Sequence, residues 1–187
     1  SDLAETINSD LSKGYVRKLS KQELSSTSDS QQWYLPHHPV QNPHKPEKVR
    51  RVCNAACKFG GTSLNDVLLP GPDLLSDLVG ILVRFRLFPI AVCADIEAMF
   101  MQVEVPHNGQ TFLRVLSREG ISDEIEVFQY TRHIFGAKSS PTCANFTVQK
   151  TASDNKTVFP LPADLGCGSF YVDEFLKSFE SVDSSVE

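Results

Sequence analysis

The chain has 187 residues, with 23 acidic and 18 basic side chains and a formal net charge of -5. This length suits one globular domain, or one with two lobes. The acidic balance excludes a binder that holds nucleic acid through overall positive charge, although a local basic groove remains compatible with it. Arginines split the most apolar stretches, 78–83 and 87–94, so no transmembrane helix or other membrane contact is expected.

The five cysteines are scattered, odd in number and without a CxxC pair, which favours a reduced, intracellular chain over a disulfide framework. A zinc site from His37, His38, Cys53 and Cys57 matches no common ligand spacing, so none is expected. The start, SDLAETINSDL, has neither an initiator Met nor a signal-peptide layout, which suggests a piece of a longer product.

The first third of the chain is predicted to consist of a polar lead-in followed by an extended segment. Residues 1–32 are a polar, flexible lead-in with a short helix near residues 3–14. Four prolines between Trp33 and Lys48 exclude a helix there and predict an extended path at a sheet edge or over a surface. The positive charge that the whole chain lacks is concentrated in the basic cluster that follows, which comprises Lys45, Lys48, Arg50, Arg51 and Lys58.

Alternating periodicities follow. Apolar residues three or four apart predict a helix over 73–87, with Asp73 near its N-terminus. The apolar run 88–96 predicts a buried central strand that delivers Asp95 at its C-terminal end. Residues 110–116 and 124–130 alternate well enough for a hairpin, so the sheet is at least partly antiparallel.

The last part of the chain predicts one more helix and one more apolar run. A helix begins at Ser140-Pro141, with Ser140 as the N-cap and Pro141 at the first helical position, and reaches about Lys150. A loop rich in Pro and Gly follows over 160–168, and then an apolar run over 170–176.

Three carboxylates occur in hydrophobic contexts: Asp95 in VCADIEAMF, and Asp173 with Glu174 in FYVDEFL. Burying them is costly unless a cation compensates, and oxygen-only ligands suit Mg²⁺ or Mn²⁺. Because successive strand residues point to opposite faces, Asp173 and Glu174 share a site only if a tight hairpin bends the chain there. The alternative is that Asp95 caps a turn and the acid pair faces solvent on an edge strand, and spacing alone leaves both open.

Several independent blocks occur in the order and spacing of reverse transcriptases: WYLPHHPV (33–40), KVRRV (48–52), SLNDVLLPGPDLL (63–75), RFR (84–86), DIEAMF (95–100), FGAKSSPTCANF (135–146) and FYVDEFL (170–176). Over about 33–176 the chain closely resembles the reverse transcriptase of the BEL/Pao class of long-terminal-repeat retrotransposons. The resemblance implies an α+β fold in which helices back a ferredoxin-like antiparallel palm sheet. It assigns residues 33–72 to a fingers segment with the basic cluster, and 73–187 to a palm with an interleaved fingers hairpin, without a thumb.

The implied activity is RNA-directed DNA synthesis. Two Mg²⁺ ions, or Mn²⁺, would be bound by Asp95, Asp173 and Glu174, and a deoxynucleotide would be joined to a primer 3′-hydroxyl. The implied partners are an RNA or DNA template-primer, deoxynucleoside triphosphates and the remainder of a polyprotein: thumb, ribonuclease H, protease and integrase. The implied location is cytoplasmic and particle-associated.

The resemblance also assigns residues to the nucleotide pocket. Phe100 matches the aromatic position under the incoming sugar that excludes a 2′-hydroxyl, although a lone Phe is more often a core residue. Arg50 matches the fingers arginine that binds the triphosphate, with Lys48 and Arg51 assisting or touching template. The alternative for these three basic residues is a solvated charge cluster.

Three further positions follow from the same motifs. Phe135 is a wall of the nucleotide pocket, and Gly136 lies where backbone approaches the substrate closely, with a plain turn as the alternative. Tyr171 packs at the primer end by resemblance, although a strand Tyr is as often structural.

Two departures support a competing interpretation. Glu174 stands where the family has its second Asp, and the extra methylene displaces the carboxylate by roughly a bond length, whereas such sites tolerate about 0.5 Å. Asn54 replaces the Asp that usually follows the basic strand. The alternative is a non-catalytic, decayed or domesticated remnant with residual nucleic-acid binding. A metal nuclease ranks last, because neither acid motif has a nearby His or Lys to activate water.

Overall fold

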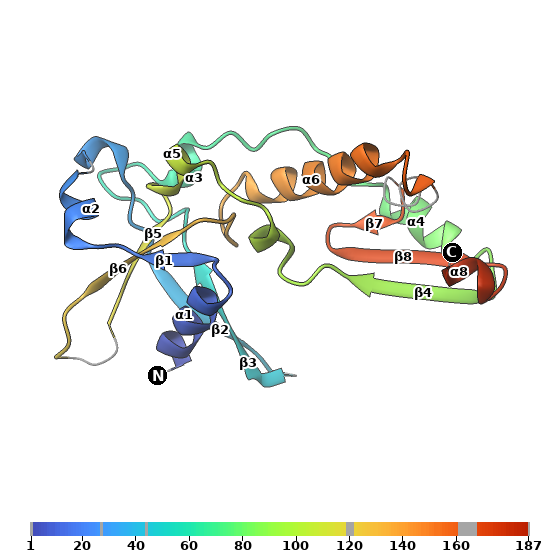
Figure 1. The fold of residues 1–187 in the computed structure, drawn as a ribbon, viewed down its shortest axis with the longest axis horizontal. Coiled ribbons are helices and arrows are strands. Elements are labelled where there is room, and N and C mark those ends of the chain that lie inside the picture. Colours follow the sequence, from blue (N-terminus) through green and yellow to red (C-terminus); the bar gives the residue numbers. More distant parts are fainter. Residues whose placement is uncertain (1, 27, 44, 119–121, 161–167, 187) are drawn as a thin grey trace. The chain divides into compact units, whose positions relative to one another are not determined.

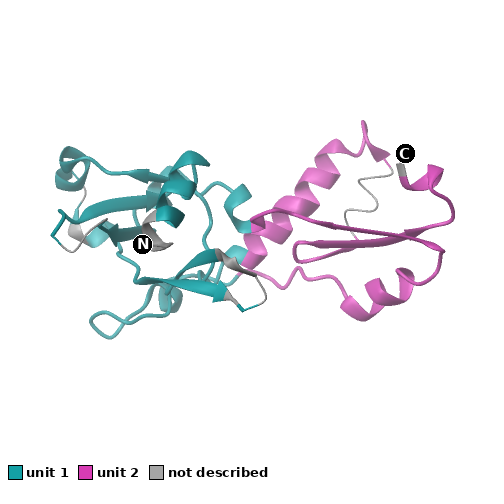
Figure 2. Cartoon of the chain, turned by 90° about the horizontal axis from the view of Figure 1, so that it is seen from below, with its two compact units in different colours: residues 1–70, 100–140 teal, residues 71–99, 141–187 magenta. Residues whose placement is uncertain are grey.

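The computed structural model describes the chain except residues 1, 27, 44, 119–121, 161–167 and 187. The chain divides into two compact units (Figure 2), unit 1 from residues 1–70 and 100–140 and unit 2 from residues 71–99 and 141–187. Each unit is therefore assembled from two separate stretches of sequence. None of the helices in the described ranges is long and apolar enough to cross a membrane.

The elements are labelled in Figure 1. Those of unit 1 are α1 (Asp2–Ser12), β1 (Val16–Lys18), α2 (Lys21–Ser26), η1 (Asp29–Gln31), β2 (His37–Asn42), β3 (Lys45–Cys53), α3 (Leu64–Val67), α5 (His107–Gln110), β5 (Arg114–Ser117) and β6 (Glu126–Tyr130). Those of unit 2 are α4 (Leu78–Arg84), β4 (Ile90–Asp95), β7 (Phe170–Tyr171), β8 (Glu174–Phe179) and α8 (Asp183–Val186). The chain changes unit within η2 (Met99–Gln102) and at the start of α6 (Ser140–Asn155).

Unit 1 contains two antiparallel sheets. One has the order β1-β6-β5, and the other is the β2–β3 hairpin (Figure 1). The hairpin predicted from residues 110–116 and 124–130 is confirmed, because β5 pairs antiparallel with β6. Its first strand begins later than predicted, since α5 occupies residues 107–110.

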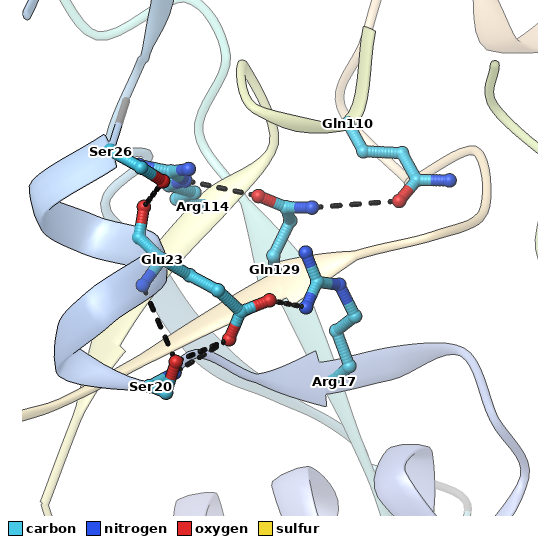
Figure 3. A network of polar contacts seen from close by, with 7 residues as sticks. All are labelled: Arg17, Ser20, Glu23, Ser26, Gln110, Arg114 and Gln129. Carbon is cyan, nitrogen blue, oxygen red and sulfur yellow. Dashed lines mark hydrogen bonds and ion pairs between the residues drawn. The ribbon is translucent and has the colours of Figure 1, made fainter. Parts of the chain in front are cut away.

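A buried polar network ties the hairpin to α5 (Figure 3). Arg114, only 2% exposed, donates from Nε to Gln129 Oε1 at 3.0 Å. Gln129 donates to Gln110 Oε1 at 3.5 Å. Gln110 in turn donates to the Val105 carbonyl at 2.9 Å. Because a buried polar group is costly without a partner, this chain of bonds favours one arrangement of β5, β6 and α5.

The prediction that residues 1–32 form a flexible lead-in is wrong, although the short helix predicted near residues 3–14 is confirmed as α1. The segment folds into α1, β1, α2 and η1, and β1 pairs with β6 from Val16 opposite Tyr130. Its few apolar side chains face inward, with Ile7 and Val16 each 3% exposed and Leu19 6% exposed. A polar composition concealed them because few apolar residues are needed when each one reaches the core.

Unit 2 contains the antiparallel sheet β4-β8-β7, and α4 contacts β8 and β7. The strand predicted over residues 88–96 exists as β4 and ends at Asp95 as predicted, but the prediction that it is central in the sheet and buried is wrong. β8 is central because it pairs with β4 on one side and β7 on the other, and Ala91, Cys93 and Ala94 are exposed. Small side chains make a run apolar in composition while giving it little area to bury.

The helix predicted over 73–87 exists but is shorter. It begins after Asp77, whose carboxylate accepts hydrogen bonds from Val79 N at 3.1 Å and Gly80 N at 3.0 Å. Asp73 instead accepts a hydrogen bond from Leu75 N at 3.0 Å, within a segment that is neither helix nor strand. The helix thus begins at Leu78, with Asp77 and not Asp73 at its N-terminus.

The helix predicted from Ser140 begins there and runs beyond the expected end, to Asn155. Ser140 does not cap the helix with its side chain as predicted, because its Oγ donates a hydrogen bond to the Ile134 carbonyl at 2.8 Å. Ser140 is fully buried, so this bond anchors the start of α6 to the preceding loop.

Candidate active site

The acid pair lies at a two-residue hairpin. Tyr171 pairs with Glu174, so Val172 and Asp173 alone form the turn between β7 and β8. Val172 has φ +57°, which costs an L-residue about 1–2 kcal/mol and is rare for a β-branched side chain. The structure therefore contains the sharp bend that a shared site for Asp173 and Glu174 requires, and it holds strained backbone there.

The third acid meets this hairpin through the sheet. Asp95, the last residue of β4, is paired directly with Glu174, and Ile96 N donates to the Asp173 carbonyl at 2.9 Å. Side chains directly opposite in an antiparallel pair share a face, with Cβ atoms about 4.5–5.5 Å apart. The fold thus brings the backbones of all three acids to one end of the unit 2 sheet.

The carboxylates are more accessible than the sequence argument assumed. Asp95 and Glu174 are exposed and Asp173 is half-buried, so no buried charge demands compensation. Among the described residues, no three His, Cys, Asp or Glu side chains form a group arranged to hold a metal ion. The donor chemistry nevertheless suits a hard cation, since all three groups offer carboxylate oxygens alone.

The basic strand β3 presents its two arginines differently. Arg50 is exposed, whereas the Arg51 side chain is only 1% exposed and forms an ion pair with Asp10 of α1. Arg50 is therefore available to a ligand. The expectation that Arg51 touches nucleotide or template directly is wrong, because its guanidinium is enclosed by protein. The side chain of Lys48 lies outside the described part of the structure.

The expected sugar gate and pocket wall lie together in unit 1. The rings of Phe100 and Phe135 have centroids 4.8 Å apart at an angle of 47°, and both residues are half-buried. Such tilted pairs are favourable for aromatic rings. The two motifs DIEAMF and FGAKSSP, distant in sequence, therefore meet through these rings.

Gly136 is required by the packing of the protein itself. Its φ is +103°, and an added Cβ would lie 2.1 Å from the Cys53 carbonyl oxygen at the end of β3. Asn65 holds the same loop, because its side chain donates to the Gly136 carbonyl at 2.9 Å and accepts from Lys138 N at 2.8 Å. Sequence reasoning missed Asn65, whose only signal was its place after the capping residue Ser63.

The cysteine at the end of β3 is an inert thiol. Burial raises the pKa of Cys53 to about 11, which keeps the sulfur protonated at neutral pH. His37 is paired with Cys53 across the β2–β3 hairpin, but its Nε2 lies 2.8 Å from the Leu116 carbonyl oxygen. Burial also lowers the pKa of His37, so this imidazole is neutral at physiological pH. Tyr171, the last of the expected site residues, is half-buried beside the acid hairpin.

The fold is similar to that of solved reverse transcriptases. The foamy viral protease-reverse transcriptase dRH in complex with double-stranded DNA matches with a TM-score of 0.65 at 18% identity, over 97% of this chain and 26% of that chain. The foamy viral protease-reverse transcriptase in complex with an RNA/DNA hybrid matches with a TM-score of 0.66 at 20% identity, over 99% and 20% respectively. Neither a protein-family model nor a curated protein matches the sequence.

These similarities define the class of fold. The chain has a reverse-transcriptase-like fold of mixed α and β elements with antiparallel sheets, as the sequence predicted. It spans about a quarter and a fifth of the two solved chains, 26% and 20%, so the similarity concerns one part of those proteins.

Proposed function

We propose that the chain is the fingers and palm part of an RNA-directed DNA polymerase of the BEL/Pao retrotransposon class. Unit 2 is the palm and unit 1 the fingers in this proposal. Its partners are an RNA or DNA template-primer and deoxynucleoside triphosphates. Support comes from the fold similarity, from the block order in the sequence and from the meeting of the three acids.

In this proposal Asp95, Asp173 and Glu174 hold two Mg²⁺ or Mn²⁺ ions. Bound metal supplies Lewis acidity, which activates the primer 3′-hydroxyl and stabilises charge on the leaving pyrophosphate. The carboxylates orient the reacting groups, and the hairpin that carries Asp173 limits how far its side chain can move.

Side chains of unit 1 select the substrate. The exposed guanidinium of Arg50 binds triphosphate oxygens, for which its planar set of donors is well suited. Phe100, held against Phe135, lies under the sugar and excludes a 2′-hydroxyl, which selects deoxynucleotides.

One observation carries the proposal: Asp95 pairs with Glu174 while Ile96 donates to Asp173, so residues far apart in sequence converge at a single sheet end. Primer extension on an RNA template, with this chain joined to a reverse-transcriptase thumb, tests it. We expect Asp95→Asn to reduce incorporation by about 100-fold or more, since the loss of an outer-shell partner alone costs about 10–100-fold in activity. Asp154→Asn, an exposed acid of α6, is the matched control. Equal incorporation by Asp95→Asn and the parent would remove the catalytic assignment.

A second candidate function is a non-catalytic remnant that retains nucleic-acid binding. Glu174 favours it, since a longer side chain at the metal site displaces the carboxylate. Glu174→Asp separates the two: it raises incorporation several-fold if the site is active but displaced, and changes nothing if the chain is a remnant.

A further inference from the structure

Arg51 is a buried charge that the proposed polymerase function does not use. Its side chain is 1% exposed, its Nη2 pairs with Asp10 Oδ2 of α1, and its guanidinium carbon lies 5.2 Å from the ring centroid of Tyr130 on β6. One side chain of β3 is therefore in contact with α1 and β6. A buried arginine is costly unless it is paired, and Asp10 supplies the pair.

The Asp10–Arg51 ion pair contributes more to the position of β3 than to the stability of the fold. Within the described residues, Arg51 Nε and Nη1 have no hydrogen-bond partner, although both atoms are buried. An apolar side chain of similar volume would avoid this loss, and replacement of a buried ion pair by apolar residues is often neutral or stabilising. What an apolar replacement cannot supply is a bond with one fixed partner in one orientation.

Two features of the β2–β3 hairpin make such a bond useful for holding β3 in place. Arg51 is paired with Pro39 of β2, which has no N–H to donate to the ladder. The register shifts further along the same strand, between Gln41 and Asn42. The register is continuous from His37 to Gln41 and breaks only beyond it, and the ion pair to α1 adds a side-chain constraint on β3 to this backbone pairing.

The alternation of side chains along β3 links the position of Arg50 to that of Arg51. Successive strand residues point to opposite faces, so fixing Arg51 inward aims Arg50 outward. Arg50 is indeed exposed, next to an enclosed Arg51. A slip or rotation of β3 would move the Arg50 guanidinium with it.

We propose that Arg51 is a positioning residue for the nucleotide: the Asp10–Arg51 pair fastens β3 to α1 and thereby holds Arg50 where it meets the triphosphate. This role rests on the proposed polymerase function, since it assumes that Arg50 binds a nucleotide. It gives the segment of residues 2–12, polar in composition, a part in substrate binding.

The test distinguishes an effect of the ion pair on the position of Arg50 from an effect on the stability of the protein. The double variant Asp10→Leu/Arg51→Met replaces the pair by apolar side chains, and Arg50→Ala removes the ligand-binding group itself. Each 187-residue protein is titrated with dATP and Mg²⁺ by calorimetry, and its thermal midpoint is recorded. Arg17→Met is the matched control, because Arg17 of β1 forms an ion pair with Glu23 of α2 in the same unit and not with β3.

We expect the double variant to keep the parent thermal midpoint and to bind dATP about ten-fold more weakly, since a misplacement of about 1 Å is enough for such a loss. Arg17→Met should bind as the parent does. Unchanged dATP affinity in the double variant would overturn the positioning role while leaving the nucleotide function in place. Absence of dATP binding by the parent would overturn both.

A second readout reports on the Asp10–Arg51 pair without nucleotide. Hydrogen exchange of the β3 amides should be faster in the double variant than in the parent and in Arg17→Met, because the pair no longer fastens β3 to α1. Equal exchange in all three proteins would overturn the fastening role whatever the dATP titrations show.

Discussion

Replacing Gly136 with alanine should destabilise unit 1 through two separable effects. The first is conformational, because φ is +103° and an L-residue with positive φ costs about 1–2 kcal/mol. The second is steric, because the new Cβ would lie 2.1 Å from the Cys53 carbonyl oxygen, well inside the 3.0 Å below which such contacts are not found. Overpacking of this kind costs about 1–3 kcal/mol. The free energy of unfolding should therefore fall by about 2–5 kcal/mol.

Gly61→Ala isolates the first effect. Gly61 has φ +88°, but no atom lies within 4 Å of the position that a Cβ would take, so only the conformational cost of about 1–2 kcal/mol applies. The assay is urea unfolding followed by the fluorescence of Trp33, the single tryptophan of the chain, which lies in unit 1. Gly136→Ala should therefore lose more stability than Gly61→Ala. Equal losses in the two variants would show that the approach of Gly136 to β3 is looser than the structure indicates.

Three further predictions concern single side chains. At pH 8 the Cys53 thiol should alkylate about 100-fold more slowly than a thiol of ordinary pKa, since burial raises its pKa to about 11. Mass spectrometry measures the alkylation rate, with the exposed Cys57 as the reference thiol. Equal alkylation rates for Cys53 and Cys57 would contradict the prediction. A hydrogen bond from Arg17 lowers the pKa of Glu23 to about 2, so the parent should be more stable than Glu23→Gln at pH 6 and lose that advantage between pH 4.5 and 2; a difference in melting temperature independent of pH would refute it. Phe100→Val should raise the incorporation of ribonucleotides relative to deoxynucleotides by about ten-fold in primer extension, and an unchanged ratio would exclude the gate.

Local signals predicted the elements best. The start of α6 at Ser140 and the β5–β6 hairpin follow from a Ser-Pro pair and from alternation, both readable within a few residues. The predicted start of α4 was wrong because Asp73 and Asp77 are chemically equivalent caps, and only packing decides between them. The predicted burial of β4 was wrong because a run containing Ala91 and Cys93 has apolar composition without much area to bury.

Contacts between distant residues lay beyond the sequence. Arg51 and Asp10 are 41 residues apart, and Asn65 and Gly136 are 71 apart, so no local pattern links them. The burial of Arg51 beside the exposed Arg50 depends on which face of β3 meets α1, and a charge cluster does not reveal that.

The candidate site was partly predictable. A lone acid after an apolar strand and an acid pair within another run singled out Asp95, Asp173 and Glu174. A tight hairpin at the acid pair was anticipated as the condition for a shared site, although not that its strained residue would be Val172. The exposure of Asp95 and Glu174 was not predicted, because apolar neighbours in the sequence do not determine which residues surround a side chain in the fold.

The proposed function requires that the three acids at the end of the unit 2 sheet hold a divalent cation together. Titration of the chain with Mn²⁺, followed by electron paramagnetic resonance, tests it most directly. We expect saturable binding that Asp95→Asn and Asp173→Asn each weaken at least about ten-fold, since the loss of an outer-shell partner alone costs about 10–100-fold in metal affinity, while Asp154→Asn leaves it unchanged. Mn²⁺ affinity that stays the same in all three variants would contradict the account.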